Sequence, residues 1–149
     1  MEKLDQAAKQ VMIAEDDDDD FMVFSVAIKE TSYKVLIIRA EDGNLLLKLL
    51  EENIPDILFL DLNMPCKDGK ECLKVIRASR RYDSLPIIIY SSLSDLTSIE
   101  YCFREGSNLY MVKPTDYGEL KTALERILTV NWSKTLYFPQ RENYVVTRG

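Results

Sequence analysis

Histidine is absent from the 149 residues of the sequence. A chain without imidazole cannot form a Ser-His-Asp triad or a Cys-His pair, and it cannot offer histidine ligands to zinc. This absence excludes the commonest hydrolase mechanisms and histidine-containing zinc sites. Any chemistry must therefore come from carboxylates, amines, hydroxyls or thiols.

Cysteine and long apolar runs are also scarce. The three cysteines, Cys66, Cys72 and Cys102, form no CxxC motif and leave one thiol over under any internal pairing, which predicts free thiols in a reducing compartment. The first ten residues are polar and the longest apolar runs reach only about five residues, so we expect neither a signal peptide nor a membrane span. These features predict a cytoplasmic protein.

Positive charge is in the minority. The sequence has 19 Lys and Arg against 25 Asp and Glu, a formal net charge of −6, so we expect binding neither to nucleic acid nor to an anionic membrane. Glycine and proline number only five each, and hydrophobic residues make up 46% of the chain. Length and composition together predict a single globular domain.

Continuous apolar segments of strand length recur five times, at residues 11–14, 35–38, 57–60, 87–90 and 109–112. Runs without alternation indicate strands that are covered on both faces, as in a parallel sheet. Apolar residues at helical spacing lie between and after them, at residues 20–30, 42–53, 68–80, 94–104 and 116–129. The alternation predicts a flavodoxin-like, doubly wound α/β fold, with a five-stranded parallel sheet of order 2-1-3-4-5 and helices on both faces.

Polar residues follow four of the five predicted strands. Glu15 and Asp16 follow the first, Asp61 the third, Ser91 the fourth and Lys113 the fifth. Because ligands of open parallel sheets bind beyond the carboxyl ends of the strands, the strand order brings these side chains together at one edge. The sequence therefore predicts a single site.

Three converging carboxylates repel one another, so their convergence indicates a bound cation. A site of oxygen ligands with room for water and phosphate favours Mg²⁺ over Ca²⁺. Lys113 and Ser91 would then hold an anionic group, most simply a phosphoryl group. Asp61 is the candidate nucleophile, because a carboxylate attacks phosphorus without first losing a proton.

The acidic run at residues 15–20 leaves the metal-binding pair open between Glu15 with Asp16 and Asp16 with Asp17. We favour Glu15 and Asp16, since they directly follow the first strand. Asp17 to Asp20 then lie at the start of the first helix, where carboxylates accept hydrogen bonds from free N–H groups and meet the positive end of the helix dipole.

Four motifs, in order, resemble the receiver domain of two-component response regulators. They are the acidic pair after VMIA, FLDLNMPCKDG at residues 59–69, YSS at 90–92 and YMVKP at 110–114. The resemblance divides the chain into an N-terminal lead (1–9), a receiver domain (9–130) and an aromatic-containing C-terminal extension (131–149).

The resemblance implies that Asp61 accepts a phosphoryl group from the phosphohistidine of a sensor histidine kinase or a histidine phosphotransfer protein. Lys113 would contact the carboxylate and then a phosphoryl oxygen. Mg²⁺ would be held by Glu15, Asp16, Asp61 and the backbone carbonyl of Asn63.

The resemblance further implies a conformational switch. Ser91 would bind a phosphoryl oxygen on activation and Tyr110 would be the aromatic switch residue. The Lys113–Pro114 peptide is expected to be cis. The phosphorylated protein would then change its binding to a downstream protein or pass the phosphate on. The alternative function is a pseudo-receiver, a scaffold that binds partners through the C-terminal extension without phosphorylation.

The extension at residues 131–149 is aromatic for a tail, with Trp132, Tyr137, Phe138 and Tyr144. Such residues pack either against their own domain or in an interface. Stand-alone regulators with an aromatic extension are similar to those paired with phytochrome-type kinases, some of which dimerise. The resemblance thus also suggests a homodimer formed through this extension.

Overall fold

The five predicted strands form one parallel sheet in the computed structural model, which describes residues 7–132 and 138–146. The strands are β1 (Lys9–Ala14), β2 (Val35–Ala40), β3 (Ile57–Leu60), β4 (Ile87–Ser91) and β5 (Leu109–Val112). Their order is β2-β1-β3-β4-β5, and every neighbouring pair is parallel. The predicted fold class is confirmed.

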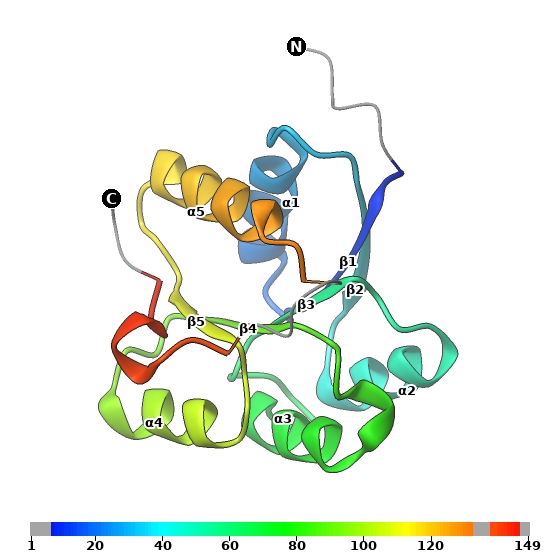
Figure 1. Ribbon diagram of the computed structural model, residues 1–149. Helices are drawn as coiled ribbons and strands as arrows, with labels where there is room; N and C mark the ends of the chain where they lie inside the picture. Colours follow the sequence, from blue (N-terminus) through cyan, green and yellow to red (C-terminus); the bar gives the residue numbers. More distant parts are fainter. Residues whose placement is uncertain (1–6, 133–137, 147–149) are drawn as a thin grey trace.

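Helices cover both faces of the sheet (Figure 1). They are α1 (Asp18–Lys29), α2 (Gly43–Glu52), α3 (Gly69–Ala78), α4 (Leu96–Arg104) and α5 (Tyr117–Thr129). The apolar side chains of α1 and α5 pack on one face, against a cluster that includes Phe59 and Ile88. Those of α2, α3 and α4 pack on the other, against Leu58 and Ile89. Adjacent residues of one strand thus enter opposite cores, which explains the continuous apolar runs.

An aspartate caps the N-terminus of each of these five helices. In every case its carboxylate accepts a hydrogen bond from the backbone N–H three residues later, which satisfies a donor that the helix itself leaves free. The caps are Asp17, Asp42, Asp68, Asp95 and Asp116. Five of the 25 acidic residues therefore have a structural role.

The three cysteines are free thiols, as predicted. Burial raises the pKa of Cys72 to about 11 and that of Cys102 to about 12, so both stay protonated at neutral pH. Cys66 is exposed and has a φ of 69°, the left-handed region. None of the helices in the described part of the chain has the length and hydropathy of a membrane span.

The C-terminal extension packs against its own domain over residues 138–146. Its backbone brackets Tyr110 of β5: the Tyr110 N–H donates to the Tyr144 carbonyl at 3.0 Å, and the Val146 N–H donates to the Tyr110 carbonyl at 2.8 Å. The fully buried ring of Tyr144 contacts Phe103 and Tyr110, and its hydroxyl hydrogen-bonds Ser107. The sequence leaves two interpretations of the extension open, packing against its own domain or an interface. Residues 138–146 pack against their own domain. Tyr137 lies outside the described residues.

Gly69 permits a close approach between α3 and the segment after β3. A Cβ atom at this position would lie 2.1 Å from the carbonyl oxygen of Asp61 and 2.7 Å from the Cα of Leu62. The Gly69 N–H also donates to the Leu62 carbonyl at 2.9 Å. The glycine of the DLNMPCKDG motif therefore fixes the backbone that carries Asp61.

Replacing Gly69 with alanine should lower the free energy of unfolding by about 1–3 kcal/mol, because the methyl group overpacks against backbone. Gly118→Ala is the matched control: its Cβ would approach only the Asp116 carboxylate, at 3.2 Å, inside a helix that favours alanine. Urea denaturation of both variants measures the difference. Equal stabilities would contradict the close-packing argument.

Tyr144→Ala should destabilise the protein by about 3–5 kcal/mol, the usual cost of removing a buried aromatic ring. Tyr144→Phe keeps the ring contacts and should cost only about 1 kcal/mol for the lost hydroxyl hydrogen bond. Thermal and urea unfolding of the full chain would test both. Wild-type stability of the alanine variant would show that the extension does not pack on the domain in solution.

Candidate functional site

The predicted site residues lie at the carboxyl edge of the sheet. Glu15 directly follows β1, Asp61 directly follows β3, Ser91 is the last residue of β4, and Lys113 directly follows β5. The parallel pairing sets this placement, because it aligns the ends of β1, β3, β4 and β5 on one side.

Three carboxylates meet there. One oxygen atom each of Glu15, Asp16 and Asp61 lies within 4.8 Å of the other two. Glu15 and Asp61 are buried and Asp16 is exposed. Asp17 instead caps α1, where its carboxylate accepts from the Asp20 N–H at 2.8 Å. Of the two alternative pairs, the structure brings Glu15 and Asp16 to Asp61.

Lys113 connects this cluster to α1. Its Nζ lies 2.6 Å from Glu15 Oε1, 2.8 Å from Asp20 Oδ2 and 3.1 Å from Asp61 Oδ2. Burial alone would lower the pKa of Lys113, but the carboxylates of Asp20, Glu15 and Asp61 raise it above its usual value. The ammonium group is therefore charged at any physiological pH.

Glu15 is the fully buried carboxylate of the cluster. Burial, and after it the neighbouring Asp61 carboxylate, raise its pKa to about 7 against the lowering effect of Lys113. Its Oε1 atom is buried and accepts no hydrogen bond of normal geometry among the described residues, although Lys113 Nζ lies close by. Oxygen donors with unsatisfied acceptor capacity and surplus negative charge are what a hard divalent cation needs. The three carboxylates therefore fit a metal ion.

Arg39 holds the backbone of the acidic pair. Its guanidinium donates to the carbonyl oxygens of Glu15 (3.0 Å) and Asp16 (3.2 Å) and pairs with Asp18 at 2.8 Å. The guanidinium also lies over the Phe21 ring, 4.5 Å from its centroid. The sequence patterns alone predict no role for Arg39.

The contact of Asp20 with Lys113 is not predicted by the sequence either, which places Asp20 only among the residues at the start of the first helix. Helical spacing gives no signal for this role, because Asp16 lies before α1 and its N-cap, Asp17.

Ser91 and Tyr110 both hydrogen-bond the backbone of Leu93. The buried Ser91 hydroxyl accepts from the Leu93 N–H at 3.2 Å, and the Tyr110 hydroxyl donates to the Leu93 carbonyl at 2.7 Å. The Tyr110 ring is fully buried in this structure. The Asn63 N–H donates to Asp61 Oδ1 at 3.3 Å, while metal binding by the Asn63 carbonyl stays a prediction.

The expectation of a cis peptide at Lys113–Pro114 is wrong: the described residues contain no cis peptide bond. The trans form is favoured by about 0.5–1 kcal/mol for peptides that precede proline. Lys113 reaches Asp61 from the trans peptide, because its N–H donates to the Ser91 carbonyl at 2.8 Å and continues the pairing of β4 with β5.

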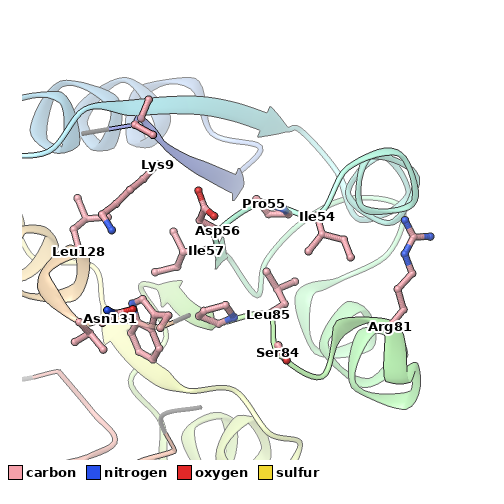
Figure 2. A pocket seen from close by; sticks show the side chains of 15 residues that line it. Lys9, Ile54, Pro55, Asp56, Ile57, Arg81, Ser84, Leu85, Leu128 and Asn131 are labelled. Carbon is pink, nitrogen blue, oxygen red and sulfur yellow. The ribbon is translucent and has the colours of Figure 1, made fainter. Parts of the chain in front are cut away.

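A cavity of about 530 Å³ lies at the opposite, amino edge of the sheet (Figure 2). Its lining includes Lys9 at the start of β1, Pro55 and Asp56 before β3, and Trp132 after α5. None of the carboxylates at the other edge lines it. The carboxylate cluster is thus separate from this cavity.

Residues 11–125 match the family model of the response regulator receiver domain. The chain belongs to this family. Receiver domains are signalling domains of two-component systems, so the convergence of carboxylates and a lysine at the sheet edge belongs to a signalling protein.

Known proteins agree with this assignment. The receiver is 34% identical over 113 residues to the DNA-binding transcriptional regulator NtrC of Proteus hauseri, covering 75% of this chain and 24% of that protein. The chain thus spans about a quarter of the length of NtrC. The fold matches the phosphorylated cyanobacterial phytochrome response regulator RcpA with a TM-score of 0.78 and 23% identity, over 90% of this chain and all of RcpA.

A third similar protein is the response regulator RPA3017 in red light signaling of R. palustris. Its structure superimposes with a TM-score of 0.76 at 25% identity, covering 89% of this chain and 99% of that one. The similarity to RcpA and RPA3017 extends over nearly their whole length, unlike the similarity to NtrC.

Addition of Mg²⁺ should raise the melting temperature of the receiver, because the ion would bind the folded carboxylate cluster. At a concentration 100 times the dissociation constant the stabilisation is about 2.7 kcal/mol, or roughly 5–10 °C for a chain of this size. Glu15→Gln should lose most of this shift, whereas the exposed Glu52→Gln on α2 should keep it. A full shift in the Glu15 variant would contradict the ligand assignment.

Proposed function

We propose that the protein is a phosphorylation-controlled switch of a two-component phosphorelay, with Asp61 as phosphoacceptor. The observation that carries the proposal is the position of the Asp61 carboxylate: it is nearly buried at the sheet edge, next to Glu15 and Asp16, with the Lys113 ammonium 3.1 Å away. The family assignment supports the same role.

In the proposed reaction a carboxylate oxygen of Asp61 attacks the phosphorus of a phosphohistidine. The P–N bond breaks, its electron pair stays on the imidazole nitrogen, and an acyl phosphate forms on Asp61. These 149 residues contain no histidine, so the phosphohistidine would lie outside them, on a sensor histidine kinase or a histidine phosphotransfer protein.

Positive charge around Asp61 favours the transfer. Lys113 would balance the charge of the phosphoryl oxygens. Mg²⁺, held by Glu15, Asp16, Asp61 and the Asn63 carbonyl, would supply further positive charge at the same oxygens. Arg39 would keep the acidic pair in place through its bonds to the carbonyls of Glu15 and Asp16.

The switch would act through the backbone of Leu93. If the Ser91 hydroxyl turns to a phosphoryl oxygen, it gives up the bond from the Leu93 N–H, and the Leu93 carbonyl is the acceptor of the Tyr110 hydroxyl. Tyr110 in turn touches the extension through both its ring and its backbone. Phosphorylation would thereby change the surface at α4 and β5, where a downstream protein could bind.

The partners are proposed from the similar proteins. RcpA is a phytochrome response regulator and RPA3017 belongs to red light signaling, so a phytochrome-type kinase is a candidate phosphodonor. We further propose that the receiver spans residues 9–130, that the extension at 131–149 contributes to a homodimer, and that the protein acts in the cytoplasm.

Incubation of the full chain with Mg²⁺ and acetyl phosphate should add the mass of one phosphoryl group, detected by intact-mass spectrometry. The adduct should be stable to acid and labile to base or hydroxylamine, as an acyl phosphate is. Asp61→Asn and a chelator should each abolish it. If neither acetyl phosphate nor a panel of histidine kinases gave an adduct, the pseudo-receiver alternative would replace this proposal.

A further inference from the structure

Asp20 is a carboxylate at the site that neither the metal cluster nor phosphoryl acceptance requires. It lies in the first turn of α1, and its Oδ2 is nearer to Lys113 Nζ (2.8 Å) than Oδ2 of the phosphoacceptor Asp61 is (3.1 Å). We propose that Asp20 is a positioning residue that competes with the phosphoryl group for Lys113 and so sets how readily Asp61 is phosphorylated. This inference rests on the proposed function.

Crowding around Lys113 requires an exchange. Its ammonium group donates hydrogen bonds to Asp20 and Asp61, and the Glu15 carboxylate lies against it at 2.6 Å. A phosphoryl oxygen can approach Lys113 only where a present partner gives way. The Glu15 side chain is fully buried and Asp61 itself carries the phosphoryl group, whereas the Asp20 side chain is 46% exposed. Water can therefore solvate the Asp20 carboxylate when it leaves Lys113. Of the three partners, Asp20 thus costs the least free energy to displace.

The negative charge of Asp20 has opposite effects on the binding of a phosphoryl group and of a cation. A negative charge on Asp20 lies within hydrogen-bond distance of the same ammonium that an incoming phosphoryl oxygen must contact, so it repels that oxygen as well as occupying the donor. For a cation the effect is reversed. The charge of Asp20 attracts Mg²⁺, and by drawing Lys113 toward α1 it reduces the competition of the ammonium for Glu15 and Asp61.

Loss of the Asp20 charge should thus strengthen the binding of a phosphoryl group and weaken the binding of Mg²⁺. A residue that merely supports the fold would change both in the same sense or neither. The opposite signs are the signature of the proposed role.

The helix start supplies a matched control. Asp19 is exposed, belongs to the same turn of α1 and carries the same charge, but it does not contact Lys113 in the described structure. Asp20→Asn and Asp19→Asn change the net charge and the helix dipole interaction equally. Neither change removes the cap, because the Asp17 carboxylate binds the backbone N–H of residue 20.

The test measures the affinity of the full chain for beryllofluoride, a phosphoryl mimic that binds a carboxylate, at saturating Mg²⁺. We expect Asp20→Asn to bind it roughly 3- to 10-fold more tightly than wild type, and Asp19→Asn to stay within about 2-fold. Asp20→Glu, which keeps the charge, should stay near wild type. The gain should shrink in 1 M salt, where the Debye length falls to about 3 Å.

A second arm titrates Mg²⁺ alone by thermal shift, where Asp20→Asn should bind several-fold more weakly than Asp19→Asn. Circular dichroism checks that every variant is folded, with Asp20→Ser as the substitute if the asparagine variant is not. Weaker beryllofluoride binding by Asp20→Asn, or equal binding by both asparagine variants, would overturn the inference. If the wild-type chain neither binds beryllofluoride nor forms the Asp61 adduct, the proposed function fails first, and the Mg²⁺ arm still decides whether Asp20 controls Lys113.

Discussion

The Lys113 ammonium, surrounded by Glu15, Asp20 and Asp61, is the interaction on which the arrangement of the site depends. Two of these carboxylates are buried at the ends of neighbouring parallel strands, where each would strongly disfavour the charge of the other without a counter-ion. A single cation does not neutralise three carboxylates. The site therefore keeps a surplus of negative charge, which suits the binding of a metal ion.

Backbone restraints hold this charge cluster in place. Arg39 fixes the carbonyl groups of Glu15 and Asp16, while Gly69 lets α3 approach the carbonyl of Asp61. The capping aspartates Asp17 and Asp68 begin α1 and α3 after the segments that follow β1 and β3. Each of these segments is therefore held between a strand and a capped helix, which fixes the position of the candidate site residues.

Most of the fold could be predicted because continuous apolar runs at regular spacing have few other solutions than a covered parallel sheet. The residues directly after the strands, Glu15, Asp61 and Lys113, could be placed for the same reason. Asp20 and Arg39 could not, because their roles depend on side-chain directions that strand and helix periodicity does not specify. The cis peptide was expected from family resemblance alone, and the pairing of β4 with β5 aims Lys113 without it.

The hydrogen bonds between the extension and the backbone of Tyr110 protect one edge of the sheet from pairing with another molecule. β5 is one of the two edge strands of the sheet. An edge strand offers unpaired N–H and C=O groups to the edge of another molecule. The parallel bridge to Val145 occupies those groups at Tyr110, in the middle of the strand. The chain thus blocks its own exposed edge, and any event that releases the segment would uncover a surface prone to aggregation.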